Sequence, residues 1–318
     1  MTTSPRPIPA VPLGVSGIQV SRLALGSWRT FERISRERGV AVMHAARQAG
    51  VTFLDDARYN DETGQAPIPT GYSEIVFGEL FRAAGWRREE TVVSNKLWWE
   101  FWPGQSPAQE LTGSLGRMGL DHVDLIYSEP PPAGVPLTEA IGMISGLIAA
   151  GLARCWGTLN WSPRLMDEAC QIAESNGVPG PVATQPPYSL VRRDVVEEPA
   201  MEQVAAERGI AIVASYALAG GVLTGKYDRD SGAGRAAGQL DQPRYAAGVA
   251  AGRQLAVLAA ELGRDPAQLA IAFALVNPAV TTVLFGATTP EQVASNVAAL
   301  SVAAELTPEE IARLRAIG

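Results

Sequence analysis

Short apolar runs alternate with longer amphipathic segments along almost the whole chain. Eight β-rich runs are each followed by a segment in which apolar residues recur at helical spacing. The predicted strands cover residues 22–25, 51–55, 91–96, 122–127, 153–158, 181–185, 210–215 and 280–286. The predicted helices cover 36–49, 72–84, 107–118, 137–150, 162–176, about 195–208, 266–276 and 290–299. Eight strand-then-helix units predict an α/β fold of the (β/α)8 TIM-barrel type.

Two segments lie outside this alternation. VPLGVSGIQV (11–20) has the alternation and the Ser-Gly turn of a β-hairpin, which we expect at the N-terminal end of the barrel. Between residues 226 and 265, a Gly-rich stretch predicts a loop that can act as a lid. An Ala-rich stretch there predicts an extra helix before the seventh barrel helix.

We expect one domain over residues 1–318, since a single barrel accounts for the whole alternation. A doubly wound sheet is the alternative fold. That fold needs a Gly-rich turn after its first strand, and LALGSWRTF has only one glycine. The barrel is therefore favoured.

Composition and charge narrow the range of partners. The chain has 33 acidic against 26 basic residues, and no stripe of Lys and Arg that would suit nucleic acid. No signal pattern and no run of 18 apolar residues is visible, so we expect a cytoplasmic protein without membrane contact. Cys155 and Cys170 are expected to be reduced, and two separated histidines make no metal set. Both a monomer and a small homo-oligomer remain open.

Polar residues follow the predicted strands at the end where barrel active sites lie. Strands two to six end, in order, near Asp55, Lys96, Glu129, Asn160 and Gln185. Tyr59 lies just beyond Asp55. An ammonium beside a phenol lowers the pKa of the phenol and makes it a usable proton donor. Lys96 within reach of Tyr59 would therefore favour proton donation by Tyr59.

Seven segments resemble the aldo-keto reductases in order and approximate spacing: GVTFLDDARYN, VVSNKLWW, GLDHVDLIYSE, WGTLNWSP, TQPPYSLVRR, SYALAGGVLTGKY and GATTPEQVASNVAAL. The resemblance implies a (β/α)8 barrel that binds NADPH without a Rossmann fold and passes hydride to a carbonyl. It implies Tyr59 as general acid, Lys96 as its activator and Asp55 as the partner that orients the lysine. Asp55 and Tyr59 are one residue closer than in the family pattern, and a long loop, NDETGQAPIPTG, follows Tyr59.

The resemblance also implies a cofactor site. Asn160 and Gln185 would hold the nicotinamide carboxamide, and Tyr216, in preference to Tyr188, would stack on the ring. The backbone of Leu218, Gly220 and Leu223 would offer N–H groups to the pyrophosphate. The adenosine end would meet Gly286, Thr288, Gln292 and Asn296, where Thr289 and Gln292 predict a capping box at a helix start. No Arg or Lys lies between 286 and 296, so NADH stays an alternative to NADPH.

The fourth catalytic position differs from the family pattern. The family places a histidine five residues after the Asp of its fourth strand, and counting five from Asp124 reaches Glu129. Glutamate there resembles the steroid double-bond reductases of the same superfamily. It occupies less space than an imidazole, and a protonated carboxyl can donate a hydrogen bond to an enone oxygen beside Tyr59. We therefore predict reduction of a conjugated C=C bond, or of C=N, in a hydrophobic substrate.

Two alternatives remain for Glu129. It can pair with Lys96 in an ordinary aldehyde or ketone reductase, or it can mark a regulatory protein that binds the cofactor but turns over little.

The loop after Lys96 carries several aromatic residues. LWWEFWPG (97–104) contains Trp98, Trp99, Phe101 and Trp102, and Trp28 after the first strand can join them. Such a set predicts a pocket for a flat or bulky apolar molecule, although some of these rings must pack under the loop.

Overall fold

The computed structural model describes residues 8–229, 239–240 and 242–317. Within this part of the chain, eight parallel strands close into a barrel in the order β10-β3-β4-β5-β6-β7-β8-β9. These strands are β3 (Leu23–Gly26), β4 (Phe53–Asp55), β5 (Val92–Leu97), β6 (Val123–Ser128), β7 (Ala153–Leu159), β8 (Ala183–Gln185), β9 (Ala211–Ala214) and β10 (Val280–Phe285). The predicted (β/α)8 barrel is confirmed.

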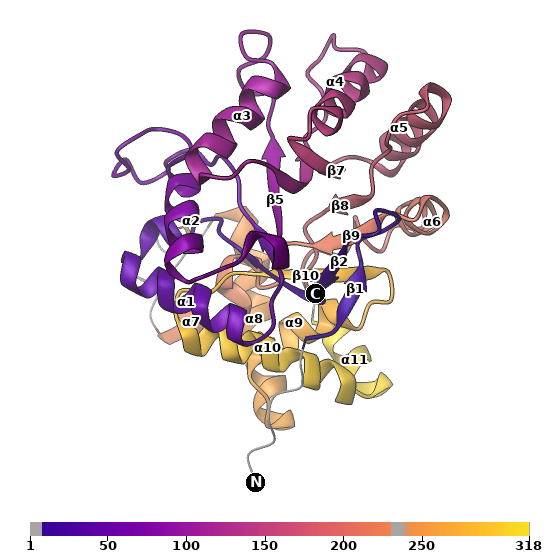
Figure 1. Cartoon of the computed structure of the whole chain (residues 1–318). Helices are drawn as coiled ribbons and strands as arrows, with labels where there is room; N and C mark the ends of the chain where they lie inside the picture. Colours follow the sequence, from indigo (N-terminus) through magenta and orange to yellow (C-terminus); the bar gives the residue numbers. More distant parts are fainter. Residues whose placement is uncertain (1–7, 230–238, 241, 318) are drawn as a thin grey trace.

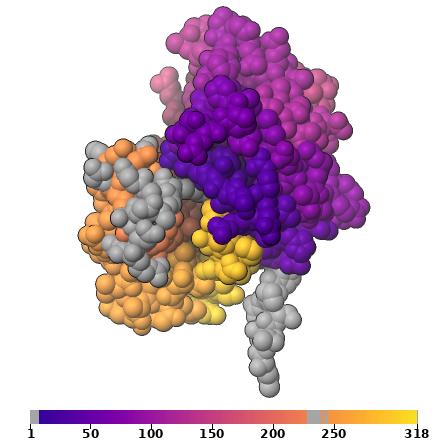
Figure 2. Space-filling view, turned by 90° about the vertical axis from the view of Figure 1, so that its left-hand side faces the viewer, coloured from indigo at the N-terminus to yellow at the C-terminus, as the bar shows by residue number. Residues whose placement is uncertain are grey.

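Helices surround the strands on all sides (Figure 1). The barrel helices are α1 (Arg36–Gln48), α2 (Tyr72–Ala83), α3 (Pro107–Met118), α4 (Leu137–Ala149), α5 (Pro163–Asn176), α6 (Pro199–Arg208), α9 (Pro266–Leu275) and α10 (Pro290–Glu305). Helix α10 contacts α1, so the outer ring closes as the strand ring does. Figure 2 shows this closure on one face, where the indigo N-terminal region lies against the yellow C-terminal helices.

The barrel strands are apolar because both of their faces are covered. All six residues of β6 are buried. Leu125 and Tyr127 belong to the cluster inside the barrel, whereas Ile126 belongs to the cluster under the helices. Glu129, the residue that follows β6, therefore lies at the C-terminal end of a strand that is packed on both faces.

A β-hairpin covers the N-terminal end of the barrel, as predicted. Strands β1 (Ala10–Pro12) and β2 (Gln19–Ser21) pair antiparallel, and Leu13 packs in the interior cluster. Gly14 has φ 54°, and a Cβ there would lie 2.2 Å from the Val182 carbonyl oxygen. Only glycine allows the turn to approach the start of β8 so closely.

The extra helix before α9 is also confirmed. The 3-10 helix η3 (Ala219–Thr224) leads to α7 (Lys226–Arg229), and α8 (Pro243–Leu262) packs back on η3. A Cβ at Gly252 would lie 2.4 Å from the Val222 carbonyl oxygen, so the contact depends on this glycine. The predicted lid loop falls mainly on residues 230–238 and 241, outside the described residues.

Several element bounds differ from the predictions. Helix α6 begins at Pro199 and not near 195, because the residue before a proline is disfavoured in helical conformation. Helix α11 (Pro308–Arg315) was not predicted, although Thr307 and Glu310 form a capping box at its start. Short 3-10 helices, η1 (Phe31–Arg33) and η2 (Arg88–Glu90), precede α1 and β5. No helix in the described ranges is long and apolar enough to cross a membrane.

Candidate active site

Three side chains predicted at neighbouring strand ends meet at the C-terminal end of the barrel. The Lys96 Nζ atom lies 2.7 Å from Asp55 Oδ2 and 3.1 Å from Tyr59 Oη. Asp55 and Lys96 are 2% and 3% exposed. The three groups meet even though Asp55 and Tyr59 are one residue closer than in the resembled pattern. The arrangement places an ammonium between a carboxylate and a phenol.

Two further donors hold the Asp55 carboxylate. Ser94 Oγ donates to Oδ1 at 2.7 Å, and Gln185 Nε2 donates to the same oxygen at 3.1 Å. A buried carboxylate is costly unless such partners surround it. Gln185 thus reaches from the end of β8 to the lysine–carboxylate pair, and its Nε2 is already engaged there.

Glu129 stands directly after β6, where its backbone N–H donates to the Leu97 carbonyl oxygen at 3.0 Å. Burial raises the pKa of the Glu129 carboxyl, and a hydrogen bond from Asn160 opposes this rise. Asn160 Nδ2 donates to Glu129 Oε1 at 2.7 Å. Asn160 has φ 60°, a left-handed conformation that asparagine adopts more readily than most residues with a side chain. No contact between Glu129 and Lys96 is among the ion pairs of the described residues, so the predicted alternative pairing is not formed here.

A cavity of about 500 Å³ lies over Tyr59 and Glu129. Its described lining residues are Trp28, Arg58, Tyr59, Asn60, Glu62, Trp98, Glu100, Glu129 and Pro130. Trp28 and Trp98 thus lie where a substrate pocket was predicted. The Tyr59 and Trp98 rings are 6.1 Å apart, so one aromatic wall continues directly from the proposed proton donor.

Trp99 and Trp102 do not line this cavity. Trp99 is buried, and its Nε1 donates to Ser128 Oγ at 2.9 Å. Trp102 packs edge-on against it, with ring centroids 5.8 Å apart. These two rings support the loop from below, in keeping with the expectation that part of the aromatic set packs under it.

One buried glutamate fixes that loop. Glu110, near the start of α3, accepts from the backbone N–H groups of Trp98 at 2.9 Å and Trp99 at 3.2 Å. Trp99 has φ 60°, so these bonds hold a conformation that the residue would otherwise avoid. Glu110 thereby sets the position of Trp98 in the cavity wall.

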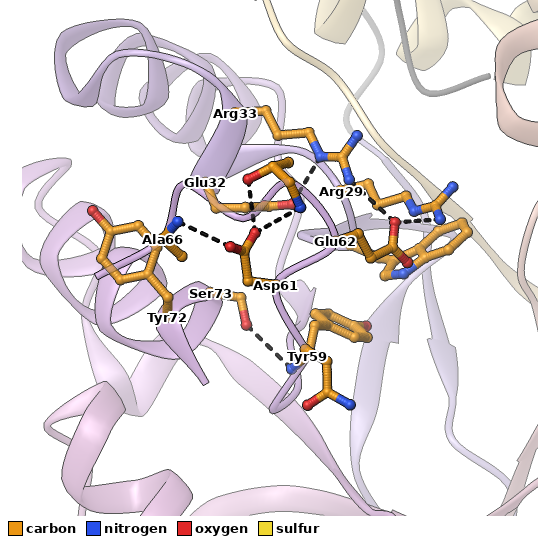
Figure 3. A pocket seen from close by; sticks show the side chains of 12 residues that line it. Arg29, Glu32, Arg33, Tyr59, Asp61, Glu62, Ala66, Tyr72 and Ser73 are labelled. Carbon is orange, nitrogen blue, oxygen red and sulfur yellow. Dashed lines mark hydrogen bonds and ion pairs between the residues drawn. The ribbon is translucent and has the colours of Figure 1, made fainter. Parts of the chain in front are cut away.

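The long loop after Tyr59 is folded around Asp61. The Asp61 carboxylate accepts from Thr63 N at 2.9 Å and from Ala66 N at 3.0 Å (Figure 3). The Thr63 hydroxyl, which donates to Asp61 Oδ1 at 2.7 Å, is the largest cause of a lowered pKa of Asp61, followed by these backbone N–H groups. The pKa falls to about 2, so Asp61 is ionised near neutral pH. A bridge between Asn60 and Thr70 closes the base of the loop.

Ion pairs tie this loop to the loop after β3. Figure 3 shows Glu62 between the guanidinium groups of Arg29 and Arg33, with the Arg33 pair at 3.3 Å. The Arg29 guanidinium carbon lies 4.7 Å from the Trp28 ring centroid. A small hollow of about 20 Å³ lies between the two loops. Glu62 and Arg29 were not predicted as site residues, because they lie in loops and not at strand ends. They also share no local sequence pattern.

Tyr216 lies at the end of β9, next to Trp28. The two ring centroids are 6.2 Å apart, and Tyr216 has φ 63°. Tyr188, in contrast, is fully buried, and its hydroxyl donates to Glu197 Oε1 at 2.8 Å. Of the two tyrosines considered for ring stacking, only Tyr216 is partly exposed.

The backbone after Tyr216 forms a tight cradle. Gly220 has φ 70°, and a Cβ there would lie 3.2 Å from Tyr216 Oη and 3.0 Å from the Tyr245 ring. Leu218 and Leu223 flank it, and the Leu223 N–H donates to the Leu218 carbonyl oxygen at 3.4 Å. A side chain at this glycine would fill the space beside the Tyr216 hydroxyl.

The start of α10 is built differently from the predicted capping box. Thr289 Oγ1 accepts from Gln292 N at 3.3 Å, as predicted. The Gln292 side chain, however, accepts from Thr288 N at 2.7 Å and not from the N-cap backbone. Asn296 Nδ2 donates to the Gly286 carbonyl oxygen at 3.4 Å. The reciprocal capping box is therefore wrong, because Gln292 reaches one residue further and orders the turn before the cap.

Comparison with known proteins shows the family of the chain. The profile described as "Aldo/keto reductase family" matches residues 22–318. The chain belongs to the aldo/keto reductase family. Similar proteins include three described as a probable or putative voltage-gated potassium channel subunit beta. The one from Oryza sativa subsp. japonica is 34% identical over 323 residues, which cover 96% of this chain and 95% of the relative. Those from Arabidopsis thaliana and Schizosaccharomyces pombe are each 32% identical, covering 93% and 98% of this chain and 92% and 93% of the relatives.

This aldo/keto reductase is an NAD(P)H-dependent oxidoreductase. The cradle at Gly220, beside the partly exposed Tyr216, fits a nicotinamide cofactor because a Cβ there would fill the space. Asn160 also suits the cofactor, since its amide donates to Glu129 and leaves its oxygen as an acceptor. Within the described residues, no group of three His, Cys, Asp or Glu side chains can hold a metal ion.

Proposed function

We propose that this aldo/keto reductase uses NADPH to reduce a conjugated C=C bond, or the related C=N bond, of a hydrophobic substrate. One observation carries the proposal. Tyr59, above Lys96, and Glu129, whose pKa is raised by burial, line the same cavity of about 500 Å³. A phenol and a carboxyl, when the carboxyl is protonated, can both donate to one substrate oxygen, and burial makes protonation of this carboxyl easier than that of an exposed glutamate.

In this proposal, Tyr59 is the principal proton donor. Lys96 Nζ, 3.1 Å from the phenol oxygen, stabilises the negative charge that remains when Tyr59 gives up its proton. Asp55 balances the lysine charge and fixes its position through the 2.7 Å contact. The strand ends that carry these groups are rigid, so the donor needs little reorganisation during reaction.

Glu129 selects the bond that is reduced. A glutamate occupies less of the cavity than the imidazole that the family resemblance expects, so an enone can enter further and present its β-carbon. Asn160 binds Glu129 Oε1, which leaves Oε2 to carry the proton and donate to the enone oxygen. Two donors on one oxygen stabilise an enolate, whereas direct carbonyl reduction requires hydride at the carbonyl carbon.

The cofactor would be held along one side of the barrel mouth. When bound, it supplies the hydride that reduces the substrate. Asn160 and Gln185 would bind the carboxamide, Tyr216 the ring, and Leu218, Gly220 and Leu223 the pyrophosphate. Gly286, Thr288, Gln292 and Asn296 would surround the adenosine. We further propose a cytoplasmic protein of one domain, monomeric or a small homo-oligomer, acting on a small molecule.

The test is NADPH oxidation, followed by absorbance, against matched enones, imines, aldehydes and ketones, with NADH in parallel. We expect turnover of enones or imines above that of saturated aldehydes. Glu129→His should shift the preference toward carbonyls, whereas Glu89→His, on the exposed 3-10 helix before β5, should leave it unchanged. If Glu129→His leaves the preference as it was, the proposed role of Glu129 is wrong. A wild type that prefers saturated carbonyls would instead support an ordinary aldehyde or ketone reductase.

A second candidate is a regulatory protein that binds the cofactor and turns over little. The names of the three similar proteins, potassium channel beta subunits, favour it. Tight NADPH binding without oxidation of any substrate in the panel would support this candidate over the enzyme.

A further inference from the structure

The charged side chains around the cavity are mostly acidic. Among the described residues that line it, Arg58 is the only one with a cationic side chain, whereas Glu62, Glu100 and Glu129 are acids. The availability of each group to a ligand depends on how it is already bound.

Arg58 lines the cavity, but its terminal nitrogens are bound to other side chains of the protein. Its side chain is 3% exposed, and its two terminal nitrogens donate to Glu100 at 2.9 Å, Thr70 at 3.0 Å and Glu110 at 3.2 Å. The Phe101 ring covers the guanidinium, with 4.8 Å between the guanidinium carbon and the ring centroid. The terminal nitrogens are thus engaged within the protein, and the Nε–H group, which has no hydrogen-bond partner among the described residues, is itself buried.

Glu100 is the open member of the same group. Its side chain is 39% exposed, against 4% for Glu110 and 3% for Arg58. Among the described residues, the one charge of Arg58 is shared by two carboxylates, and the other partner of Glu100 is neutral, since Asn60 Nδ2 donates to it at 3.1 Å. Arg58, Glu100 and Glu110 together carry an excess negative charge. The exposed Glu100 carboxylate presents this charge to the cavity.

The Glu62 group has a different balance. Glu62 contacts both Arg29 and Arg33, so its charge is matched within the protein. Glu129, whose described side-chain partner is the neutral Asn160, carries a proton in the proposed function. The unmatched negative charge of the rim therefore lies on the Glu100 side, next to Trp98.

The walls beside Glu100 suit a cation. Trp28, Trp98 and Tyr59 present aromatic rings to the cavity, and aromatic faces attract ammonium and guanidinium groups. Protein cations already lie near two of these rings, since the Arg29 guanidinium carbon is 4.7 Å from the Trp28 centroid and Lys96 Nζ is 5.5 Å from the Tyr59 centroid. Trp98, beside Glu100, is therefore the ring best placed for a cation of a ligand. A carboxylate and several aromatic rings around one cavity are the elements of an ammonium-binding site.

We propose that the cavity recognises a positively charged ammonium group on a hydrophobic substrate, held by Glu100 and the aromatic walls, and that it rejects carboxylate-bearing substrates. The inference rests on the proposed function, since it names the substrate class of that same cavity. It makes Glu100 a specificity-determining residue.

The test uses three probes on one scaffold that cannot be reduced: 4-(trimethylammonio)benzyl alcohol, 4-tert-butylbenzyl alcohol and 4-(hydroxymethyl)benzoate. The first two have nearly the same shape and differ in charge. Calorimetric titration of the full chain with NADPH present should give a Kd for the cation about tenfold below that of the neutral probe. The anion should bind more weakly than either.

Variants assign the effect to one carboxylate. Glu100→Gln should bring the cationic and neutral probes within about twofold of each other, because it removes the unmatched charge and leaves the Arg58–Glu110 pair. Glu100→Asp, which keeps the charge, should retain part of the preference. The control Glu89→Gln removes an exposed carboxylate beyond the other end of β5 and should change nothing.

Equal binding of the cationic and neutral probes by the wild type would overturn the inference, as would an unchanged ratio in Glu100→Gln. These outcomes are separate from the reduction itself. Turnover of enones without charge preference would retain the proposed function and reject the ammonium site. The expected order of binding without any turnover would retain the site and reject the reductase.

Discussion

The lysine–carboxylate pair offers the sharpest test of how the site is built. Replacing Lys96 by methionine keeps most of the side-chain volume and removes the charge that faces Asp55 Oδ2 at 2.7 Å. Ser94 and Gln185 would continue to donate to Oδ1, so the other carboxylate oxygen loses its partner. The result is an uncompensated charge inside the barrel mouth.

The size of the effect follows from burial. Both side chains are less than 5% exposed, so solvent screens their interaction very little. Breaking a buried ion pair by removing one partner costs about 3–5 kcal/mol of unfolding free energy. Lys96→Met and Asp55→Asn should each show a loss of this order. The double variant removes both charges, so its loss should be smaller than the sum of the single losses by about 3 kcal/mol.

Urea denaturation followed by circular dichroism measures these differences, and NADPH oxidation is measured on the same samples. The double variant should regain stability but not turnover, since the phenol has lost its cationic neighbour. The control cycle is Arg313→Met with Glu261→Gln, an ion pair whose side chains are 45% and 54% exposed. Its coupling should be at most about 1 kcal/mol. Additive losses at positions 55 and 96 would show that the two charges do not compensate each other.

Two further predictions concern the proposed donor and the cofactor cradle. Burial raises the pKa of Glu129, so the protonated donor is present at low pH and is lost as the pH rises through that raised value. Enone turnover by the wild type should therefore fall on the alkaline side, and Glu129→Gln, which keeps a donor, should remove that limb from the pH–rate profile. Gly220→Ala would place a Cβ 3.2 Å from Tyr216 Oη at φ 70° and should weaken NADPH binding about tenfold in a fluorescence titration. Gly116→Ala, on an exposed helix face with open space around its Cβ, should not change the Kd.

The barrel could be predicted because its strands and helices each leave a local pattern of apolar residues in the sequence. Strands covered on both faces become short apolar runs, and helices that pack on one side show the helical period. The bounds failed where a local signal was overlooked, as at Pro199, which ends the preceding non-helical stretch. Helix α11 was missed because it lies beyond the eighth strand-then-helix unit, despite its capping box.

The residues at the centre of the site could also be predicted from the positions of the strands. Asp55, Lys96, Glu129 and Gln185 stand at the ends of strands, so barrel geometry brings them together whatever the loops do. The walls of the cavity could not be derived in this way. Glu110 acts through backbone N–H groups of another element, and no short sequence pattern records such a contact.

The same limit applies to the two loops that close the site. Glu62 and Arg29 are joined by loop conformation, and Arg58 reaches Glu100 across two loops. Contacts of this kind depend on how each loop folds, so the sequence alone predicted aromatic walls but not the charges between them.

If Glu129 directs hydride to the β-carbon of an enone, a label transferred with the hydride must appear at that carbon of the product. The enzyme would be given benzylideneacetone and NADPH that carries deuterium on nicotinamide C4, and the product examined by NMR. We expect deuterium at the β-carbon with the wild type and at the carbonyl carbon with Glu129→His. Deuterium at the carbonyl carbon with the wild type would show that Glu129 does not direct hydride to the β-carbon.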